Sequence, residues 1–356
     1  GDPTTKDDMF IRFSDQESID QADSYIVKAE NTAGTQRLAD GSKIMGAIKG
    51  RDAIYVWTDT ALFLMRFVGA PFTFSFEQVG TNCGLFGKNA AVEVDGSSYW
   101  MSENGFFTYD GQLKSMPCLV EDYVYDSVND TSRDLINCGL NNLFGEINWF
   151  YCSENSDKVD RVVTYNYLDS SAKQPIWTTG SLDRTAWQDS SVFNRPHATY
   201  YTPSDNDSFD VTGNTDGITI YYNQETGTDQ INAGGVVTAI QANILSGDFD
   251  ITQKRSNTGQ AVGTPDLRGD GEYIMRISRF IPDFINQTGT TQVSFTTRAY
   301  PNSTPVTTNF PIDSTTTFKS TRIRARSIAL KVSNTGSNQD WKLGTFRLDV
   351  APGGMR

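Results

Sequence analysis

"SYWMSENGFFTYDG", residues 98–111, predicts a strand, a turn, a second strand and a second turn within one short stretch. Asn104-Gly105 and Asp110-Gly111 are typical of tight hairpin turns, because Asn, Asp and Gly accept the positive φ that such turns need. Between the turns, the run "FFTY" carries aromatic side chains that suit a pleated surface. The stretch therefore predicts antiparallel β-structure.

Similar stretches recur through the first part of the chain, and helical periodicity is almost absent. We expect strand, turn and strand over 53–67, three strands over 90–116, and hairpins over 141–169, with a tip at 153–157, and over 197–227.

The aromatic strand before each hairpin supplies a repeat period. Trp57, Trp100, Trp149 and Tyr200 are 43, 49 and 51 residues apart, close to the period of about 40–50 residues of propeller blades. The strands are mixed apolar runs without strict alternation of apolar and polar residues. This is expected where neighbouring blades cover both faces of each sheet. These features predict a β-propeller-like set of antiparallel blades.

From about residue 250 the pattern changes to longer strand candidates. In "QVSFTTRAY", residues 292–300, one face carries Val293, Phe295 and Thr297 and the other is polar, which indicates half-buried antiparallel sheet. We expect a C-terminal β-sandwich-like domain after a polar, Gly-rich linker. The predicted organisation is a connecting segment at 1–36, propeller-like blades at 37–250, a linker at 251–271 and the sandwich-like domain at 272–356.

The net charge of −13 argues against nucleic-acid binding over the whole surface. Residues 1–249 carry 16 basic and 35 acidic residues, whereas residues 250–356 carry 14 basic and 8 acidic residues. This asymmetry suggests two regions with different partners. No run approaches the roughly 20 apolar residues of a membrane helix. The polar start, which lacks an initial Met, suggests a chain cut from a longer polypeptide.

The cysteines lack the spacing of a metal site, and we interpret them as buried thiols in a reducing compartment rather than as a disulfide framework. They are Cys83, Cys118, Cys138 and Cys152.

Catalytic motifs are weak in this sequence. His197 is the single histidine, no G-x-S-x-G elbow occurs, and we interpret His197 as structural. A propeller glycosidase needs two carboxylates across the sugar bond. The candidate acids mostly flank turns, where carboxylates satisfy backbone donors: Glu93, Asp95, Glu103, Asp110, Glu121 and Asp122. We therefore expect no enzyme, no catalytic residue and no cofactor.

Two further motifs have plain explanations. The acidic loop at 204–217 resembles a calcium loop, but Phe209 stands where an oxygen ligand is needed, so we expect a solvated hairpin tip and no metal site. Arg268-Gly269-Asp270 resembles a cell-adhesion motif, and we interpret it as a chance match.

The basic strand "FKSTRIRARSIALKV", residues 318–332, is the candidate interaction site, with Lys319, Arg322, Arg324 and Arg326 as its residues. The three arginines share one side of a strand, but the same face continues into apolar residues. Either a bulge follows Arg326 or the strand passes from an exposed edge into a core. The arginines suit DNA phosphates or a partner's carboxylates; alternatively, they protect a solvated sheet edge.

The chain resembles a family of virion structural proteins of short-tailed bacteriophages, the tail-nozzle proteins, which include tail tubular protein B and packaged-DNA stabilisation proteins. The resemblance runs from end to end. It rests on "GDPTTKDDMFIRFSDQE", "VWTDTALFLMRFVGAPFTF", "YWMSENGFFTYDG", "PCLVEDYV", "GEINWFYCSE", "SRFIPDF", "RARSIAL" and "WKLGTFRLDVAPGG".

This resemblance implies a homohexameric ring that continues the tail tube below the portal and adaptor, retains packaged DNA, passes it during ejection and carries tail fibres or spikes. It implies a virion protein that is assembled in the host cytoplasm. It also suggests that an acidic channel wall lets DNA slide, because phosphate affinity depends on cations. The alternatives are a carbohydrate-binding propeller for host attachment, which predicts exposed aromatics at hairpin tips, and a propeller glycosidase.

Overall fold

The computed structural model describes residues 6–19, 23–171, 174–189, 196–203, 218–224, 229–231, 237–251, 271–334 and 336–354. The chain divides into two compact units, Gly1–Thr226 and Gly227–Arg356. The described residues form antiparallel sheets, one short helix, α1 (Glu121–Tyr125), and a 3-10 helix at Asp130–Leu135. None of the helices in these ranges is long and apolar enough to cross a membrane.

The first sheet of unit 1 has the strand order β3-β4-β5-β6 and confirms the strand, turn and strand expected over 53–67. Its strands are β3 (Ile44–Lys49), β4 (Ile54–Thr58), β5 (Ala61–Gly69) and β6 (Thr73–Thr81). The last two form a long hairpin whose turn includes Gly69 at φ 77°.

The second sheet contains the opening stretch and has four strands where we expected three. Asp110-Gly111 closes one more hairpin, with Gly111 at φ 107°, and so adds a strand after "GFFTY". The strands are β7 (Ala91–Val94), β8 (Ser97–Ser102), β9 (Gly105–Tyr109) and β10 (Leu113–Met116).

The third and fourth sheets continue the pattern and confirm the predicted hairpins. The third contains β11 (Asn137–Asn141), β12 (Glu146–Tyr151), β13 (Arg161–Asn166) and β14 (Trp177–Gly180). The fourth has three strands, β15 (Ala186–Gln188), β16 (His197–Pro203) and β17 (Ile218–Gln224).

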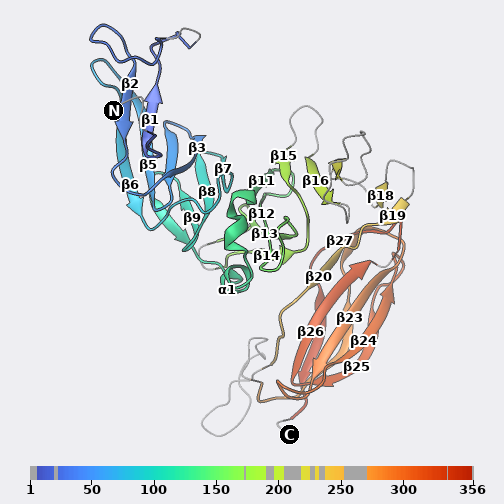
Figure 1. Ribbon diagram of the computed structural model, residues 1–356. Coiled ribbons are helices and arrows are strands. Elements are labelled where there is room, and N and C mark those ends of the chain that lie inside the picture. Colours follow the sequence, from blue (N-terminus) through green and yellow to red (C-terminus); the bar gives the residue numbers. More distant parts are fainter. Residues whose placement is uncertain are drawn as a thin grey trace, which may run out of the picture. The chain divides into compact units, whose positions relative to one another are not determined.

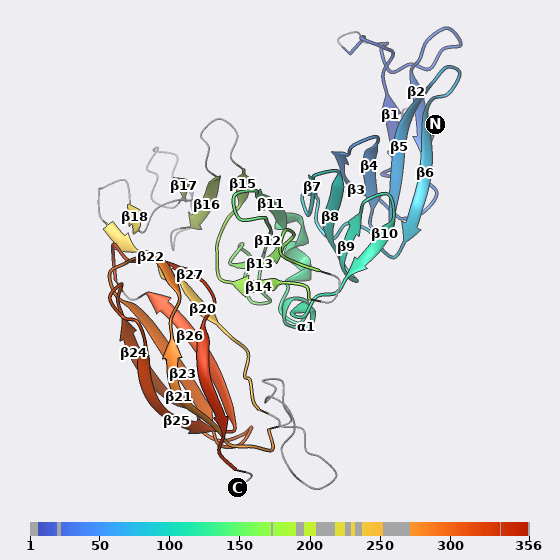
Figure 2. The same ribbon diagram turned by 180° about the vertical axis from the view of Figure 1, so that it is seen from behind.

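The predicted repeat corresponds to one position in these four sheets. Trp57, Trp100, Trp149 and Tyr200 each lie on the second strand of their sheet. The first strands are spatial neighbours, with β3 beside β7, β7 beside β11, and β11 beside β15 (Figures 1 and 2). Sheets that succeed one another by their first strands form propeller-like blades.

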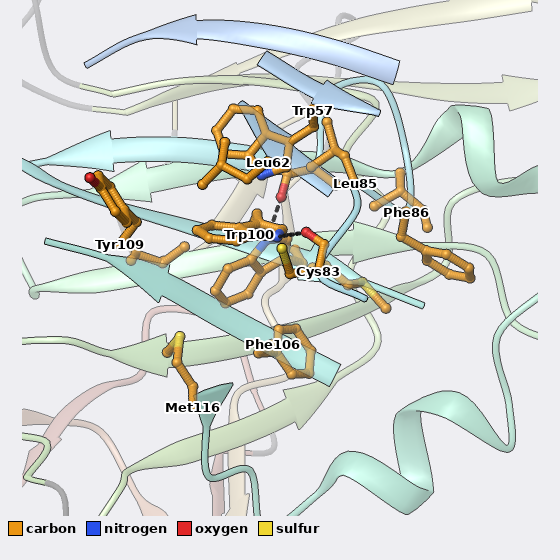
Figure 3. Packing of buried hydrophobic residues seen from close by; sticks show 14 of the residues in the cluster. Trp57, Leu62, Cys83, Leu85, Phe86, Trp100, Phe106, Tyr109 and Met116 are labelled. Atoms are coloured by element: carbon orange, nitrogen blue, oxygen red, sulfur yellow. Dashed lines mark hydrogen bonds between the residues drawn. The ribbon is translucent and has the colours of Figure 1, made fainter. Parts of the chain in front are cut away.

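Aromatic packing between the sheets forms the largest core of unit 1. The rings of Trp57 and Trp100 are 5.3 Å apart, and those of Phe106 and Trp149 are 5.0 Å apart. Figure 3 shows Trp57, Trp100 and Phe106 with Leu62, Leu85 and Met116 around them. Buried aromatic side chains contribute large apolar areas and favour edge-to-face contacts, as between Trp57 and Trp100.

A smaller core covers the other face of the first sheet. The two-stranded sheet of β1 (Phe10–Phe13) and β2 (Gly34–Arg37) belongs to this side. Met9 and Leu38 are buried there with Val56 and Phe63. The ring of Phe13 lies 4.9 Å from that of Phe74 in an edge-to-face contact.

Unit 2 is β-sandwich-like. One sheet has the order β20-β26-β23-β24 and the other β25-β21-β28. Their strands are β20 (Asn243–Leu245), β21 (Met275–Ile281), β23 (Thr291–Arg298), β24 (Val306–Ile312), β25 (Lys319–Ala325), β26 (Ser327–Asn334) and β28 (Arg347–Pro352). Phe280 and Phe295, one from each sheet, pack with ring centroids 5.4 Å apart. As predicted, Val293 and Phe295 on β23 face the core.

Two further strand pairs complete unit 2. They are β18 (Asp229–Ile231) with β19 (Val237–Ala239), and β22 (Phe284–Thr288) with β27 (Asp340–Leu343). From the sequence we expected the blades to extend to residue 250. In the structure, the boundary between the two compact units lies between Thr226 and Gly227. Strand β20, which lies before residue 250, pairs with β26 of the sandwich. Most of the expected linker lies outside the described residues. The predicted all-β class of antiparallel sheets is confirmed, and the succession of sheets in unit 1 before the sandwich-like unit 2 is compatible with the predicted propeller-like blades.

Candidate functional site

The basic segment of unit 2 forms two strands in two different sheets. β25 is an edge strand, in the order β25-β21-β28, and β26 is an inner strand of the opposite sheet. Arg326 lies between them, and its N–H donates to the carbonyl of Arg298. In β25 Thr321, Ile323 and Ala325 are buried, whereas in β26 Ile328 and Val332 are buried. The chain passes from one sheet to the other at Arg326. This explains why the two-residue alternation carries exposed arginines before Arg326 and buried apolar residues after it.

Arg322 and Arg324 are both exposed on the outward face of β25. Arg324 is directly opposite Arg276 on β21, which is also exposed. Directly opposed residues of an antiparallel pair have their Cβ atoms about 4.5–5.5 Å apart, and like charges in such pairs are destabilising. The geometry thus brings three guanidinium groups onto one face.

Two more arginines from the neighbouring strands share this outward face. A register shift between Ile277 and Arg279 leaves Arg279 exposed, and its Nε donates to Asp349 Oδ2 at 2.6 Å. Arg347 on β28 is exposed on the same side as Asp349. We call Arg276, Arg279, Arg322, Arg324 and Arg347 the arginine face. Sequence reasoning missed three of its members because they come from β21 and β28; the alternation in "MRISRF" was the available signal.

Arg326 and Lys319 do not belong to the arginine face. Arg326 Nη1 donates to the carbonyls of Gly271 and Glu272 at 2.9 and 2.8 Å, and its guanidinium lies 5.6 Å from the ring centre of Tyr300. Lys319 is half-buried at the start of β25, on the side of the strand opposite to Arg322. The four residues predicted as one interaction site therefore do not act together. Arg322 and Arg324 are an exposed pair, Arg326 is a structural arginine, and Lys319 lies on the other side of the strand.

A groove follows the open edge of the sandwich at β25. Its volume is about 300 Å³, and residues of both sheets line it: Thr297, Thr308, Phe310, Arg322, Ile323 and Arg324. An edge strand carries backbone groups that no neighbouring strand pairs. The arginine face thus adjoins an edge that is open to solvent.

Unit 1 carries an apolar surface at the tip of the hairpin formed by β5 and β6. The exposed fractions of Phe67, Val68 and Phe72 are 74%, 54% and 76%. A groove of about 450 Å³ lies beside them, lined by residues of this hairpin and of the chain between β1 and β2. In that connecting chain, Ile26 and Val27 are also exposed. We call Ile26, Val27, Phe67, Val68 and Phe72 the apolar tip.

The carboxylates considered for catalysis mostly stabilise turns. Glu93 accepts from the N–H of Gly96 at 2.7 Å, and Asp110 accepts from Gln112 N and from Lys114 Nζ. Glu121 differs, because burial raises its pKa and the charge of Asp122 adds to that effect.

Glu146 is a carboxylate that sequence reasoning did not consider. It is half-buried at the start of β12, and burial raises its pKa, while the hydrogen bond from Asn141 opposes that shift.

The remaining motif residues offer little chemistry in the described part of the chain. His197 is buried on β16. All four cysteines are free thiols, with Cys83 and Cys152 buried. Within the described ranges, no group of three His, Cys, Asp or Glu side chains is placed to hold a metal ion. The calcium-like loop and Arg268-Gly269-Asp270 lie outside those ranges.

Comparison with known proteins gives no match to a family model and no match among curated proteins. Solved structures overlap the chain at low similarity. An exo-beta-1,3-galactanase from Phanerochaete chrysosporium, with beta-1,3-galactotriose, is 8% identical over 83% of this chain and 78% of that chain, with a TM-score of 0.26. The same enzyme with galactose is 7% identical over 84% and 77%, also at 0.26. A glycoside hydrolase is 10% identical over 85% and 84%, at 0.25.

These overlaps correct the expectation that the chain is not an enzyme, because the overlapping structures are glycoside hydrolases. At these TM-scores they assign neither an activity nor an active site to this chain.

Proposed function

We propose that the chain is a virion structural protein, a tail-nozzle subunit that assembles with copies of itself, as a hexamer, into a ring-shaped DNA channel. In this role it adjoins adaptor and tube proteins, retains packaged DNA, passes it during ejection and docks fibres or spikes. The class of protein in this proposal comes from the resemblance of the sequence to tail-nozzle proteins. The apolar tip gives it physical support.

The apolar tip is the single observation that carries an assembly role. Phe67 and Phe72 are exposed by about three quarters, although each would gain roughly 1.5–3 kcal/mol from burial. Contiguous exposed apolar patches on soluble proteins mark interaction surfaces. A groove beside the tip offers a recess for a partner's side chains. A subunit that buries this tip against a neighbour accounts for both features.

A second candidate, carbohydrate binding for host attachment, is favoured by the same aromatic residues. This function predicts exposed aromatic side chains at hairpin tips, and the tip at 153–157, with the sequence "SENSD", carries none. Phe67 and Phe72 at the tip of the β5–β6 hairpin meet that expectation. Aromatic faces can stack on sugar rings as well as on protein.

The mass and symmetry of the particle formed by the full chain test the proposal directly. Native mass spectrometry with electron-microscope class averages should give a six-fold ring with an axial channel. Phe67→Ser/Phe72→Ser should shift the particle toward monomer. The matched control, Leu143→Ser/Phe144→Ser, changes two exposed apolar residues elsewhere and should leave the ring intact.

A particle that stays monomeric at all accessible concentrations would contradict the nozzle proposal. Binding of a host polysaccharide by this monomer, lost in Phe67→Ser/Phe72→Ser and kept in the control, would establish the carbohydrate-binding function instead. Release of sugars from that polysaccharide would identify a glycosidase, for which Glu121 and Glu146 would be the first residues to change.

A further inference from the structure

The arginine face contains more positive charge than the folding of its own sheet requires. Arg279 is paired with Asp349, and elsewhere Arg298 pairs with Asp248 and Arg66 with Glu77. In contrast, Arg276, Arg322, Arg324 and Arg347 make no ion pair with any carboxylate of the described residues. Five guanidinium groups and one carboxylate leave this face strongly positive in a chain whose net charge is −13.

Protection of a sheet edge does not explain this distribution. Charged side chains on an edge strand discourage pairing with another chain, and β25 is such a strand. Arg276, however, lies on β21, the central strand, where both edges are already paired. Placing it opposite Arg324 costs stability in the absence of an anion. The pair is therefore better explained by a ligand that neutralises it.

The composition of the face indicates which kind of ligand fits. Outward-facing neighbours of the arginines are small or polar: Ser278, Ser320 and Ala351. Exposed large apolar residues of unit 2 lie elsewhere, apart from Phe318 beside Arg279. Stable protein interfaces have an apolar, aromatic-rich centre, which this face lacks. Phosphates need only positive charge and forked donors, which guanidinium groups supply.

We propose that the arginine face binds the sugar–phosphate backbone of nucleic acid without reading its sequence, through Arg276, Arg322 and Arg324. Side chains two residues apart on β25 are about 6.6–6.8 Å apart along the strand, and neighbouring strands are about 4.8 Å apart. The arginines thus form a two-dimensional array that can engage several phosphates at once. This inference rests on the proposed function, in which DNA passes along the subunit, and names the surface that meets it.

The test measures binding of a fluorescein-labelled DNA duplex of random sequence to the full chain, by anisotropy over a range of NaCl concentrations. Each phosphate that an arginine neutralises contributes about 0.9 to the slope of log affinity against log salt. The triple variant Arg276→Ala/Arg322→Ala/Arg324→Ala should reduce that slope by up to about 3, and weaken binding at 0.1 M salt by about tenfold for each phosphate that is no longer neutralised. The control Arg37→Ala/Arg66→Ala/Arg298→Ala removes equal charge from arginines that already have carboxylate partners, and should bind much as the unchanged chain does.

Three results would overturn the inference: no duplex binding by the unchanged chain at 50 mM salt, equal slopes for the two triple variants, or displacement of the duplex by millimolar inorganic phosphate at constant ionic strength. The last would identify a site for single phosphates. Loss of assembly in the arginine variant with unchanged DNA binding would assign the face to a protein partner. A ring that does not bind DNA would contradict this inference alone, and a monomer that binds DNA through these arginines would contradict the nozzle proposal alone.

Discussion

The indole N–H of Trp149 donates to the main-chain carbonyl of Ala90 at 2.9 Å, across 59 residues of sequence. The same carbonyl accepts from the N–H of Met101. Ala90 immediately precedes β7 of the second sheet, and Trp149 lies on β12 of the third. Trp187 of β15 repeats the arrangement by donating to the carbonyl of Leu140 on β11. Tryptophan side chains therefore fix successive sheets to each other as well as filling the space between them.

Replacing Trp149 should cost more stability than replacing its counterpart in the first sheet. Trp149→Phe loses the bond to Ala90, a net contribution of about 0.5–1.5 kcal/mol, together with some packing. Trp57 is equally buried, but its Nε1 has no acceptor among the described residues. Trp57→Phe should lose packing alone. Urea unfolding of both variants should show the Trp149 variant less stable by about 1 kcal/mol, and equal losses would show that the indole bond contributes little.

Arg326 should behave differently from Arg322, although both belong to one basic segment. Arg326→Ala removes two hydrogen bonds to the carbonyls of Gly271 and Glu272 and the packing against Tyr300. A hydrogen bond from a charged donor contributes at most about 1.5–3 kcal/mol to stability. We therefore expect Arg326→Ala to lower the free energy of unfolding by about 1–3 kcal/mol. Arg322→Ala changes an exposed residue and should stay within about 0.5 kcal/mol. Thermal unfolding of both variants checks this, and a larger loss for Arg322 would contradict the assignment.

The sequence predicted the local β-structure well because turn chemistry is local. Asn104-Gly105 and Asp95-Gly96 occupy the expected turns, with Asp95, Gly96 and Gly105 at positive φ. The sequence missed several strands at the edges of the sheets, among them β3, β6 and β10. β10 is short and half-polar, so "LKSM" has no pattern that separates it from a loop. The spacing of Trp57, Trp100 and Trp149 predicted equivalent strands correctly, because the first three sheets of unit 1 each have four antiparallel strands in chain order.

The site was less predictable because it depends on contacts between distant strands. Arg322 and Arg324 could be found from their alternation on one strand. Arg276 could not be placed beside them, since its pairing with Arg324 joins residues 48 positions apart through the register of β21 and β25. The sheet change at Arg326 likewise depends on which sheet accepts the next strand.

The four cysteines should resist alkylation in the folded protein. Burial raises the pKa of Cys83, Cys118 and Cys152 to about 11, and it also raises the pKa of Cys138. At pH 8 the thiolate fraction at a pKa of about 11 is about one in a thousand, and the thiolate is the reactive form. Mass spectrometry after iodoacetamide at pH 8 should show slow modification of the folded chain and four adducts in urea. A thiol that reacts equally fast in both states would contradict its burial.

Glu146→Gln should stabilise the protein at neutral pH and lose that effect in acid. Burial raises the pKa of Glu146, so the folded state binds its proton more tightly than the unfolded state, in which the value is about 4.5. Stability therefore falls as the pH rises from the unfolded value through the folded one, and the whole penalty is present above both. Glutamine carries no charge to desolvate, and its amide can donate to the Oδ1 of Asn141, which has no hydrogen-bond partner among the described residues.

Unfolding in urea at pH 7 and pH 3.5 separates these effects for Glu146→Gln and for a control, Glu103→Gln, at an exposed carboxylate. Because the unchanged chain and each variant are compared at the same pH, the titration of other groups cancels. We expect a higher free energy of unfolding for the Glu146 variant at pH 7 and a much smaller difference at pH 3.5, where Glu146 is protonated in both states. A variant less stable than the unchanged chain at pH 7 would show that the charged form of Glu146 is stabilised by its surroundings, and that burial is not the dominant influence on this carboxylate.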